Sequence, residues 1–270
     1  MRLFTSSIAK LLPRPVTWVT LGITLGLLGL IYVAIGGSAA QIRTQPGGQQ
    51  ALQILRFPSA YEGVLSFLLG LGGLLAVIYG AAVAGSEWTW GTLKNAVARG
   101  EGRIRYMLAT FASVAVLVGV GLVIAFVFGV LAAAVGSLIA GVGTDGIDDA
   151  ATLAGMPEKL ARGWLAISQE AALGFAIATI ARSQLAGIGA GIAIYFAESF
   201  ATLFLPDIVK YMPFNAASAV VAASTSGDSA FGGGLAARLE PDTALVVVIA
   251  WLVGALVVSG LVTERADIGG

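Results

Sequence analysis

The sequence contains no cysteine and no histidine. Without cysteine there are no disulfides or thiolate nucleophiles, and without both residues there are no Cys/His zinc sites and no Ser-His-Asp triads. A nucleotide-binding P-loop is absent as well, since none of the lysines stands in the context G-x-x-x-x-G-K-[ST]. We therefore expect that the chain is not an enzyme, has no catalytic or metal site and binds no cofactor itself.

Charged residues are scarce. The 270 residues are 57% hydrophobic and 11% charged, whereas about 25% of the residues of a soluble domain are charged. Lys plus Arg and Asp plus Glu number 15 each, so the net charge gives no reason to expect a nucleic-acid partner. This composition indicates that the chain is surrounded by a lipid bilayer.

Six apolar stretches are long enough to cross a bilayer, which takes about 20 mostly apolar residues. We predict an all-α integral membrane protein, a single transmembrane domain over residues 1–270, with six helices at about 16–36, 63–84, 107–136, 163–181, 184–205 and 243–262. Outer loops are expected at 37–62, 137–162 and 206–242. The first stretch exceeds the roughly 7–15 apolar residues of a secretory signal, which favours an uncleaved anchor. The third is longer than one span requires, which predicts a tilted or protruding helix.

Basic residues are distributed unevenly around these stretches. With the N-terminus inside the cell, nine lie on the cytoplasmic side: Arg2, Lys10, Arg14, Lys94, Arg99, Arg103, Arg105, Arg182 and Arg265. Six lie on the outer side: Arg43, Arg56, Lys159, Arg162, Lys210 and Arg238. Cytoplasmic loops carry the excess of Lys and Arg, so this bias predicts that both termini are cytoplasmic.

Proline and glycine indicate how the helices pack. All eight prolines lie outside the apolar stretches or at their rims, which argues against the broken helices of many ion-coupled transporters. Gly22-x-x-x-Gly26 and Gly187-x-x-x-Gly191 place small residues on one helix face. Packing within one subunit is favoured there over a dimer contact. Residues 224–235 (STSGDSAFGGGL) are predicted to form a flexible outer loop.

The segment 86–106 (SEWTWGTLKNAVARGEGRIRY) lies between the second and third stretches. With Thr92 as N-cap and Gly100 as stop, it predicts a helix over 93–99. Leu93, Ala96 and Val97 then share one face, and Trp88 and Trp90 suit the membrane interface. On spacing alone, this is equally the pattern of an ordinary positively charged loop with aromatic anchors.

Two carboxylates, Glu170 and Glu198, fall inside the fourth and fifth stretches, about 10–12 Å from their outer ends. Carboxylates at such a depth are costly and mark candidate functional residues for a polar cavity, a cation or a proton. Alternatively, nearby polar side chains satisfy them: Ser168, Gln169, Ser199 and Thr202.

Outside the spans, DGIDD (145–149) lacks the spacing of a calcium loop and predicts a solvated loop or helix cap.

Several motifs occur in a meaningful order. Glu87-x-x-x-Gly91-Thr92-Leu93 precedes a short helix and then Arg103, ahead of a long span. ATIARSQLAGIGAGIAIYF (178–196) contains an Arg-Ser pair between two spans, and KYMPFNAASAVV (210–221) follows the fifth. The chain ends with TERADI (263–268), in which Ala266 replaces an expected basic residue. Together these motifs resemble the permease, or membrane-spanning, subunits of type-2 ATP-binding-cassette (ABC) exporters.

The resemblance implies that the segment between the second and third helices is a coupling helix that docks onto a separate cytoplasmic ABC ATPase subunit. It assigns ATPase coupling to Glu87, Gly91, Thr92, Leu93, Lys94, Val97, Arg99 and Arg103. A compact helix transmits motion from the ATPase to both flanking spans, whereas a floppy loop absorbs it. Glu87 is predicted to pair with a basic residue, for which Arg103 and Arg105 are candidates, or with the ATPase.

The resemblance further implies a substrate path along the second and fifth helices of two paired permease subunits, either identical or closely related. Glu198 is then the main path candidate, together with Tyr195 on a neighbouring turn and Glu170. Two copies of the cytoplasmic ATPase are expected to bind ATP and Mg. The permease itself is expected in a prokaryotic plasma (inner) membrane. The exported substrate is expected among drugs, lipids, glycans or peptides.

Two other functions fit the residues. The chain is alternatively an ion-coupled secondary transporter with Glu170 and Glu198 as proton carriers, or a non-transporting membrane scaffold whose charged segment recruits a cytoplasmic partner. An ATPase that co-purifies and is stimulated favours the exporter. Flux driven by a pH gradient without ATP favours the secondary transporter.

Overall fold

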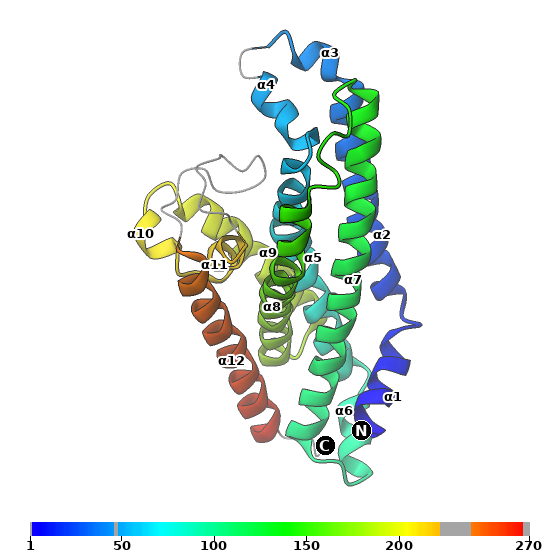
Figure 1. Cartoon of the computed structure of the whole chain (residues 1–270). Coiled ribbons are helices and arrows are strands. Elements are labelled where there is room, and N and C mark those ends of the chain that lie inside the picture. Colours follow the sequence, from blue (N-terminus) through cyan, green and yellow to red (C-terminus); the bar gives the residue numbers. More distant parts are fainter. Residues whose placement is uncertain (1, 46–47, 222–238, 267–270) are drawn as a thin grey trace.

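Helices form all the regular structure of the residues that the computed structural model describes, namely 2–45, 48–221 and 239–266 (Figure 1). Six of them are long and apolar enough to cross a membrane: α2 (Pro15–Gly37), α5 (Ser59–Thr89), α7 (Arg103–Ile139), α8 (Ala150–Ala181), α9 (Gln184–Ala201) and α12 (Pro241–Arg265). The predicted all-α class with six candidate membrane-spanning helices is confirmed.

Short helices connect the long ones. They are α1 (Arg2–Leu11), α3 (Ala39–Ile42), α4 (Gly48–Ala51), the 3-10 helix η1 (Leu52–Leu55), α6 (Thr92–Ala98), α10 (Pro206–Val209) and α11 (Pro213–Ala219). α1, α6 and the last turn of α12 lie at one end of the bundle, which we call the α6 end (Figure 1). α3 and α4 lie at the opposite end.

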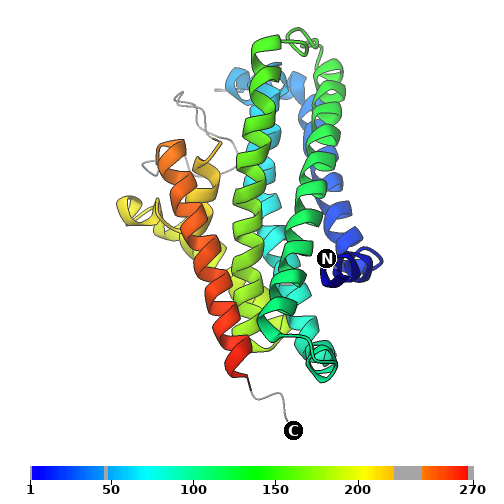
Figure 2. The ribbon, with the colours of Figure 1, turned by 60° about the horizontal axis from the view of Figure 1, so that its bottom comes forward.

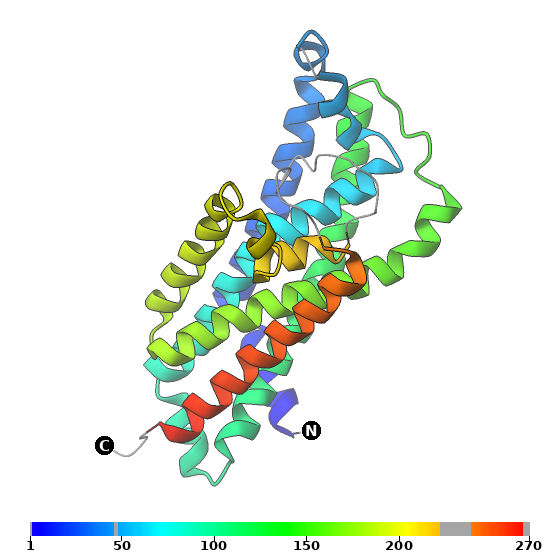
Figure 3. The same ribbon diagram turned by 90° about the vertical axis from the view of Figure 1, so that its left-hand side faces the viewer.

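The centre of the bundle is the pair α5 and α8. In each of these helices 67% of the most apolar window is buried, against at most 28% in the other four. α2 and α7 pack side by side on one flank, and α12 packs against α8 on the other (Figure 2). α9 packs on α5 and α8 at the edge of the bundle (Figure 3).

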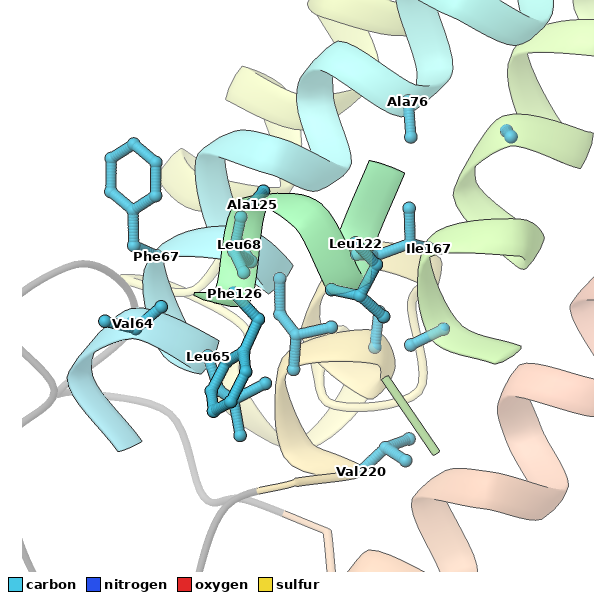
Figure 4. Close-up of a cluster of buried hydrophobic side chains, with 14 of the residues drawn as sticks. Val64, Leu65, Phe67, Leu68, Ala76, Leu122, Ala125, Phe126, Ile167 and Val220 are labelled. Atoms are coloured by element: carbon cyan, nitrogen blue, oxygen red, sulfur yellow. The ribbon is translucent and has the colours of Figure 1, made fainter. Parts of the chain in front are cut away.

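Apolar side chains fill the space between the central helices. Leu65 and Leu68 of α5, Leu122 and Phe126 of α7 and Ile167 of α8 belong to one buried cluster (Figure 4). The outer faces of the bundle are apolar too. On α7, for example, the exposed residues include Val120, Val123, Val127 and Leu131. Exposed apolar area on this scale suits contact with lipid chains rather than with water.

The backbones of α5 and α8 touch where glycines face each other's helix. A Cβ at Gly80 would overlap the carbonyl of Ala171, and a Cβ at Gly174 would overlap the carbonyl of Val77. Helices in a bilayer associate through such close packing because lipid supplies no hydrophobic driving force. Glycine is therefore required at these two positions for contact rather than for backbone conformation.

Two long helices differ from simple spans. α7 has 37 residues, roughly 55 Å at 1.5 Å per residue, so it tilts or protrudes from a hydrocarbon core about 30 Å thick, as expected. α8 begins at Ala150 instead of residue 163, because Asp149 caps it and the helix runs on through the second half of the predicted loop. Pro157 consequently lies inside a helix, in the part of α8 that precedes the predicted apolar stretch.

The other predicted outer loops contain short helices: α3, α4 and η1 in 37–62, and α10 and α11 in 206–242. The predicted flexible loop 224–235 and the last residues of TERADI lie outside the described residues. Gly187 and Gly191 pack against Ala178 and Val77 of the same chain, as the intrasubunit interpretation predicts. Gly22 and Gly26 face no atom of the described part of the chain within 4 Å.

The contact between α5 and α8 predicts opposite effects for two alanine substitutions on α5. Gly80→Ala should lower the free energy of unfolding by about 2 kcal/mol, because the new Cβ forces the helices apart. Gly72→Ala, whose Cβ would be 3.8 Å from its nearest neighbour, should be neutral or stabilising by up to about 1 kcal/mol. Unfolding in mixed micelles measures both, and equal stability of the two variants would contradict the backbone contact.

Candidate functional site

Glycines set the ends of α6. Gly91 is its N-cap with φ of 63°, and Gly100 follows it with φ of 85°. Both values lie in the left-handed region that glycine adopts without steric strain. The helix spans Thr92–Ala98, one residue earlier than predicted. Thr92 does not cap it, because the Thr92 hydroxyl donates instead to Glu87 Oε2 at 2.5 Å.

The two faces of α6 differ as its sequence predicts. Leu93 and Ala96 are buried, and Val97 is half-buried. Lys94 and Arg99 are exposed, and Arg99 Nε donates to the carbonyl of Asn95 at 3.1 Å. α6 therefore presents cations at the surface while its apolar side packs against α5 and α7.

The carboxylate of Glu87, 5% exposed at the end of α5, joins five elements. Lys10 Nζ of α1 lies 2.5 Å from Oε1, and Arg14 Nη2, at the N-cap of α2, lies 3.2 Å from the same oxygen. Thr92 of α6 and Tyr106 of α7 each donate a hydroxyl to Oε2 at 2.5 Å. We call this set the Glu87 cluster: Lys10, Arg14, Glu87, Thr92 and Tyr106.

Glu87 pairs with basic residues, as predicted, but these are Lys10 and Arg14 rather than the candidates Arg103 and Arg105. Arg103 Nη1 donates to the carbonyls of Glu264 and Ala266 at 2.9 and 2.8 Å, so it joins the start of α7 to the end of α12. Arg105 is exposed. Glu87 instead meets cations from the N-terminal part of the chain, because α1 folds back along α7 at the α6 end.

Aromatic rings extend the Glu87 cluster. The Arg14 guanidinium lies 5.1 Å from the ring centroid of Trp90, and that of Arg182 lies 5.2 Å from the ring centroid of Trp88. Arg182, with φ of 52°, ends α8, and Ser183 caps α9 by accepting from the Ala186 amide at 3.3 Å. The Arg-Ser pair thus forms a tight turn that is packed against the end of α5.

The Glu87 cluster is only partly screened from its surroundings. Burial lowers the pKa of Lys10, although its hydrogen bond to Glu87 acts in the opposite direction. A cavity of about 20 Å³ lies beside Glu87 and is lined in part by Tyr106, Thr110, Thr179 and Thr263. That volume holds about one water molecule, and the hydroxyls around it supply hydrogen-bond partners.

Glu170 lies deeper in the bundle than predicted. Because α8 begins at Ala150, Glu170 stands roughly 30 Å along the helix from its start. Its side chain is fully buried and rests on Gly73 of α5, where a Cβ would overlap the carboxylate. Neither carboxylate oxygen has a hydrogen-bond partner in the described part of the chain.

Glu198 holds the start of α11. Its Oε2 accepts hydrogen bonds from the amide of Phe214 at 3.1 Å, the amide of Asn215 at 3.2 Å and the side chain of Asn215 at 3.1 Å. Its Oε1 has no hydrogen-bond partner among the residues that the structure describes. Glu198 lies one turn from the end of α9 at Ala201, which is closer to that end than predicted.

The polar residues expected to satisfy these carboxylates do not reach them. Ser199 donates to the carbonyl of Tyr195, and Thr202 donates to the backbone carbonyl of Glu198. The side chains of Ser168 and Gln169 have buried atoms without partners within the described ranges. Hydroxyls on a helix bond to carbonyls of the preceding turn, so closeness in sequence did not indicate closeness to the carboxylates.

The structure brings the three path candidates together. Glu170 interacts electrostatically with both Glu198 and Tyr195. The Tyr195 ring packs edge to face on Phe214, with ring centroids 5.0 Å apart. We call Glu170, Glu198, Tyr195 and Phe214 the carboxylate pair and its rings. This set lies where α5 and α9 meet α8 and α11.

DGIDD is a helix cap rather than a calcium loop. Asp149 Oδ2 accepts from the amide of Thr152 at 2.9 Å and from its hydroxyl at 2.5 Å, which caps α8. These hydrogen bonds lower the pKa of Asp149. Over the described ranges, no group of three or more acidic side chains is arranged to hold a metal ion.

Sequence reasoning missed Lys10, Arg14, Tyr106 and Asn215 as members of these sites. Lys10 and Arg14 are four residues apart and are the last cations before the first span, which is the only sequence signal that links them. The spacing of Tyr106 and Asn215 relative to their glutamate partners carries no signal, because separate elements bring them together.

One family matches most of the chain. The family described as "Protein of unknown function (DUF2705)" matches residues 46–269, a range that includes α5 to α12. No curated protein matches the chain.

The Glu87 cluster predicts a specific loss of order at the α6 end. Glu87→Gln leaves Lys10 and Arg14 without a counter-charge and should lower the free energy of unfolding by about 2 kcal/mol. Amide hydrogen exchange should become faster in α1 and α6. Glu62→Gln, at the exposed end of α5 in an ion pair with Lys159, is the control and should change stability by less than about 1 kcal/mol. Unchanged exchange in α1 and α6 of the Glu87 variant would refute the role of the carboxylate.

Proposed function

The chain belongs to the DUF2705 family, whose name assigns no activity, and we propose that it is the membrane permease subunit of an ABC exporter. Two such subunits form the substrate path, and two copies of a separate cytoplasmic ABC ATPase bind ATP and Mg and supply the energy. The ATPase docks on α6, the coupling helix, at the α6 end.

The observation that supports this function best is the way in which Glu87 fixes α6 to the bundle. α6 follows α5 after a turn at Trp90 and Gly91, and its first residue donates to the carboxylate on α5. The same carboxylate accepts from Tyr106 of α7, the helix that follows. A push on α6 therefore moves the ends of α5 and α7 together, because charge-assisted hydrogen bonds with little solvent access resist stretching.

Docking requires an accessible face, which α6 provides. Lys94 and Arg99 are exposed, and Arg105 near the start of α7 is exposed as well. This cationic face suits an acidic groove of an ATPase, since complementary charges steer association and set the orientation. Leu93 and Ala96 remain packed inward, so docking leaves the support of α6 intact.

The distribution of charge supports a cytoplasmic α6 end. Lys10, Arg14, Lys94, Arg103 and Arg182 belong to elements that meet there. Cytoplasmic surfaces of membrane proteins carry this excess of cations. Both ends of the chain are then in the cytoplasm, and α3, α4 and α11 are toward the outer side of a prokaryotic plasma (inner) membrane.

The substrate path runs along α5 and α9 and is completed by a second permease subunit, identical or closely related. α9 and the turn that follows it expose Phe196, Phe200 and Phe204, so this face is free of other helices of the described chain. The carboxylate pair and its rings lie beside that face. Glu198, Tyr195 and Glu170 are the residues that contact substrate there.

Reversing the charge of α6 tests the docking. Lys94→Glu combined with Arg99→Glu should reduce co-purification of the ABC ATPase encoded with this chain by at least about tenfold, because like charges then face the acidic groove. Stimulated ATP hydrolysis should fall in parallel. Pull-down of the ATPase from detergent solution and the hydrolysis rate of the complex measure both effects.

Lys210→Glu, at a half-buried position just beyond α10 and far from α6, is the matched control and should leave association unchanged. Association at the wild-type level in the α6 double variant would refute docking at α6. Flux through vesicles that contain the chain but no ATPase would refute the exporter as a whole and favour an ion-coupled transporter. A stable complex that shows neither ATP hydrolysis nor transport would instead favour a non-transporting membrane scaffold.

A further inference from the structure

The charge of Glu170 is not balanced by any side chain of the described residues. The carboxylate is fully buried, and neither oxygen accepts a hydrogen bond there. Glu198 and Tyr195 are close enough to interact with it electrostatically, and neither carries a positive charge. Placing an ionised carboxylate in an apolar interior costs several kcal/mol or more unless a positive group meets it, and such groups mark function in membrane proteins.

The surroundings of Glu170 are shaped to hold its carboxylate. Gly73 leaves the space that the carboxylate occupies, and any side chain there would displace it. Gly80, two turns further along α5, instead packs on the backbone of α8. Glycine at 73 therefore makes room for the carboxylate, whereas glycine at 80 allows the two helices to touch. Glu170 therefore differs from Glu198, one oxygen of which already has the structural task of holding α11.

The site offers two kinds of group that attract a positive charge, namely carboxylate oxygens and aromatic rings. Glu170 offers two oxygens, and Glu198 offers Oε1, all without partners in the described part of the chain. Tyr195 and Phe214 add two aromatic rings at right angles, with ring centroids 5.0 Å apart. Divalent metal ions favour six or more oxygen ligands, whereas carboxylates with aromatic faces are the usual receptors for ammonium groups.

We propose that Glu170 and Glu198 Oε1, together with the rings of Tyr195 and Phe214, bind an organic ammonium group, and that the exported substrate is an organic cation. The role of this site in export rests on the proposed function, but binding itself does not require the ATPase. Tyr195 is half-buried and precedes the exposed Phe196, so the site adjoins the open face of α9.

Binding to the purified chain in lipid nanodiscs, without an ATPase, tests the site. The probe is benzyltrimethylammonium, and the neutral molecule of the same shape, neopentylbenzene, is its control. The wild-type chain should bind the cation saturably. Glu170→Gln, which changes charge and not shape, should weaken binding at least tenfold while leaving uptake of neopentylbenzene unchanged. Glu62→Gln, on the exposed end of α5, should bind the cation as the wild type does.

A second variant keeps the test independent of folding. Tyr195→Leu removes one ring from a half-buried position and should weaken cation binding roughly three- to tenfold, since one cation–π contact is lost. Thermal unfolding of each variant shows whether the fold persists. Equal binding by the wild type and Glu170→Gln, or preference for the neutral probe, would overturn the cation site.

The same measurements separate this site from the proposed function. Cation binding lost in Glu170→Gln, in a chain that never associates with an ATPase, would establish the site and refute the exporter. Association and stimulated ATP hydrolysis without cation binding would keep the exporter and overturn the cation site. ATP-dependent uptake of benzyltrimethylammonium into inverted vesicles by the full complex, lost in Glu170→Gln, would support both.

Discussion

The ion pairs and hydrogen bonds of Glu87 are the interaction on which the α6 end depends. Without that carboxylate, Lys10 and Arg14 would lose their counter-charge, and the hydroxyls of Thr92 and Tyr106 would lose their shared acceptor on α5. Lys10 and Arg14 carry one positive charge more than Glu87 balances, so the Glu87 cluster remains attractive to anions even when it is intact. A single acidic residue thus holds the geometry of this surface, and the cations around it give the surface its positive sign.

α5 connects the two sites. Glu87 stands at one end, and Gly73 lies roughly 21 Å along the helix toward the middle of the bundle. Between them Gly80 brings the backbone of α5 against that of α8, the helix that carries Glu170. At Gly80 and Gly174 the two helices meet backbone to backbone, so α5 links the Glu87 cluster to the helix that carries Glu170.

The sequence was sufficient for the class of fold and for the position of α6, because lipid imposes a length and a composition that each span must meet. Glycine at 91 and 100 and the apolar spacing of Leu93 and Ala96 likewise made the short helix predictable. The partner of Glu87 was not predictable, since Lys10 and Arg14 reach it through the fold of α1 rather than through spacing. For the same reason the hydroxyls near Glu198 in sequence proved irrelevant, and the amides of α11 took their place. The start of α8 was missed because 150–162 is too polar to count as a span, although Asp149 has the chemistry of a cap.

A link between the sites follows from where rigid and yielding contacts lie. At the α6 end, short charge-assisted bonds from four elements hold the end of α5, so α6 and α5 move as one body. In the middle of the bundle, the carboxylate of Glu170 has no hydrogen-bond partner among the described residues and lies against Gly73. In the proposed exporter, a push on α6 is carried along α5 toward this contact. A side chain brought to the place of Gly73 would overlap the carboxylate, so movement of α5 relative to α8 changes the surroundings of Glu170. The firmly held Glu87 and the glycine that meets Glu170 are thus on the same helix, α5. In the proposed exporter, this arrangement lets a partner that pushes on α6 change the environment of a carboxylate deep in the membrane.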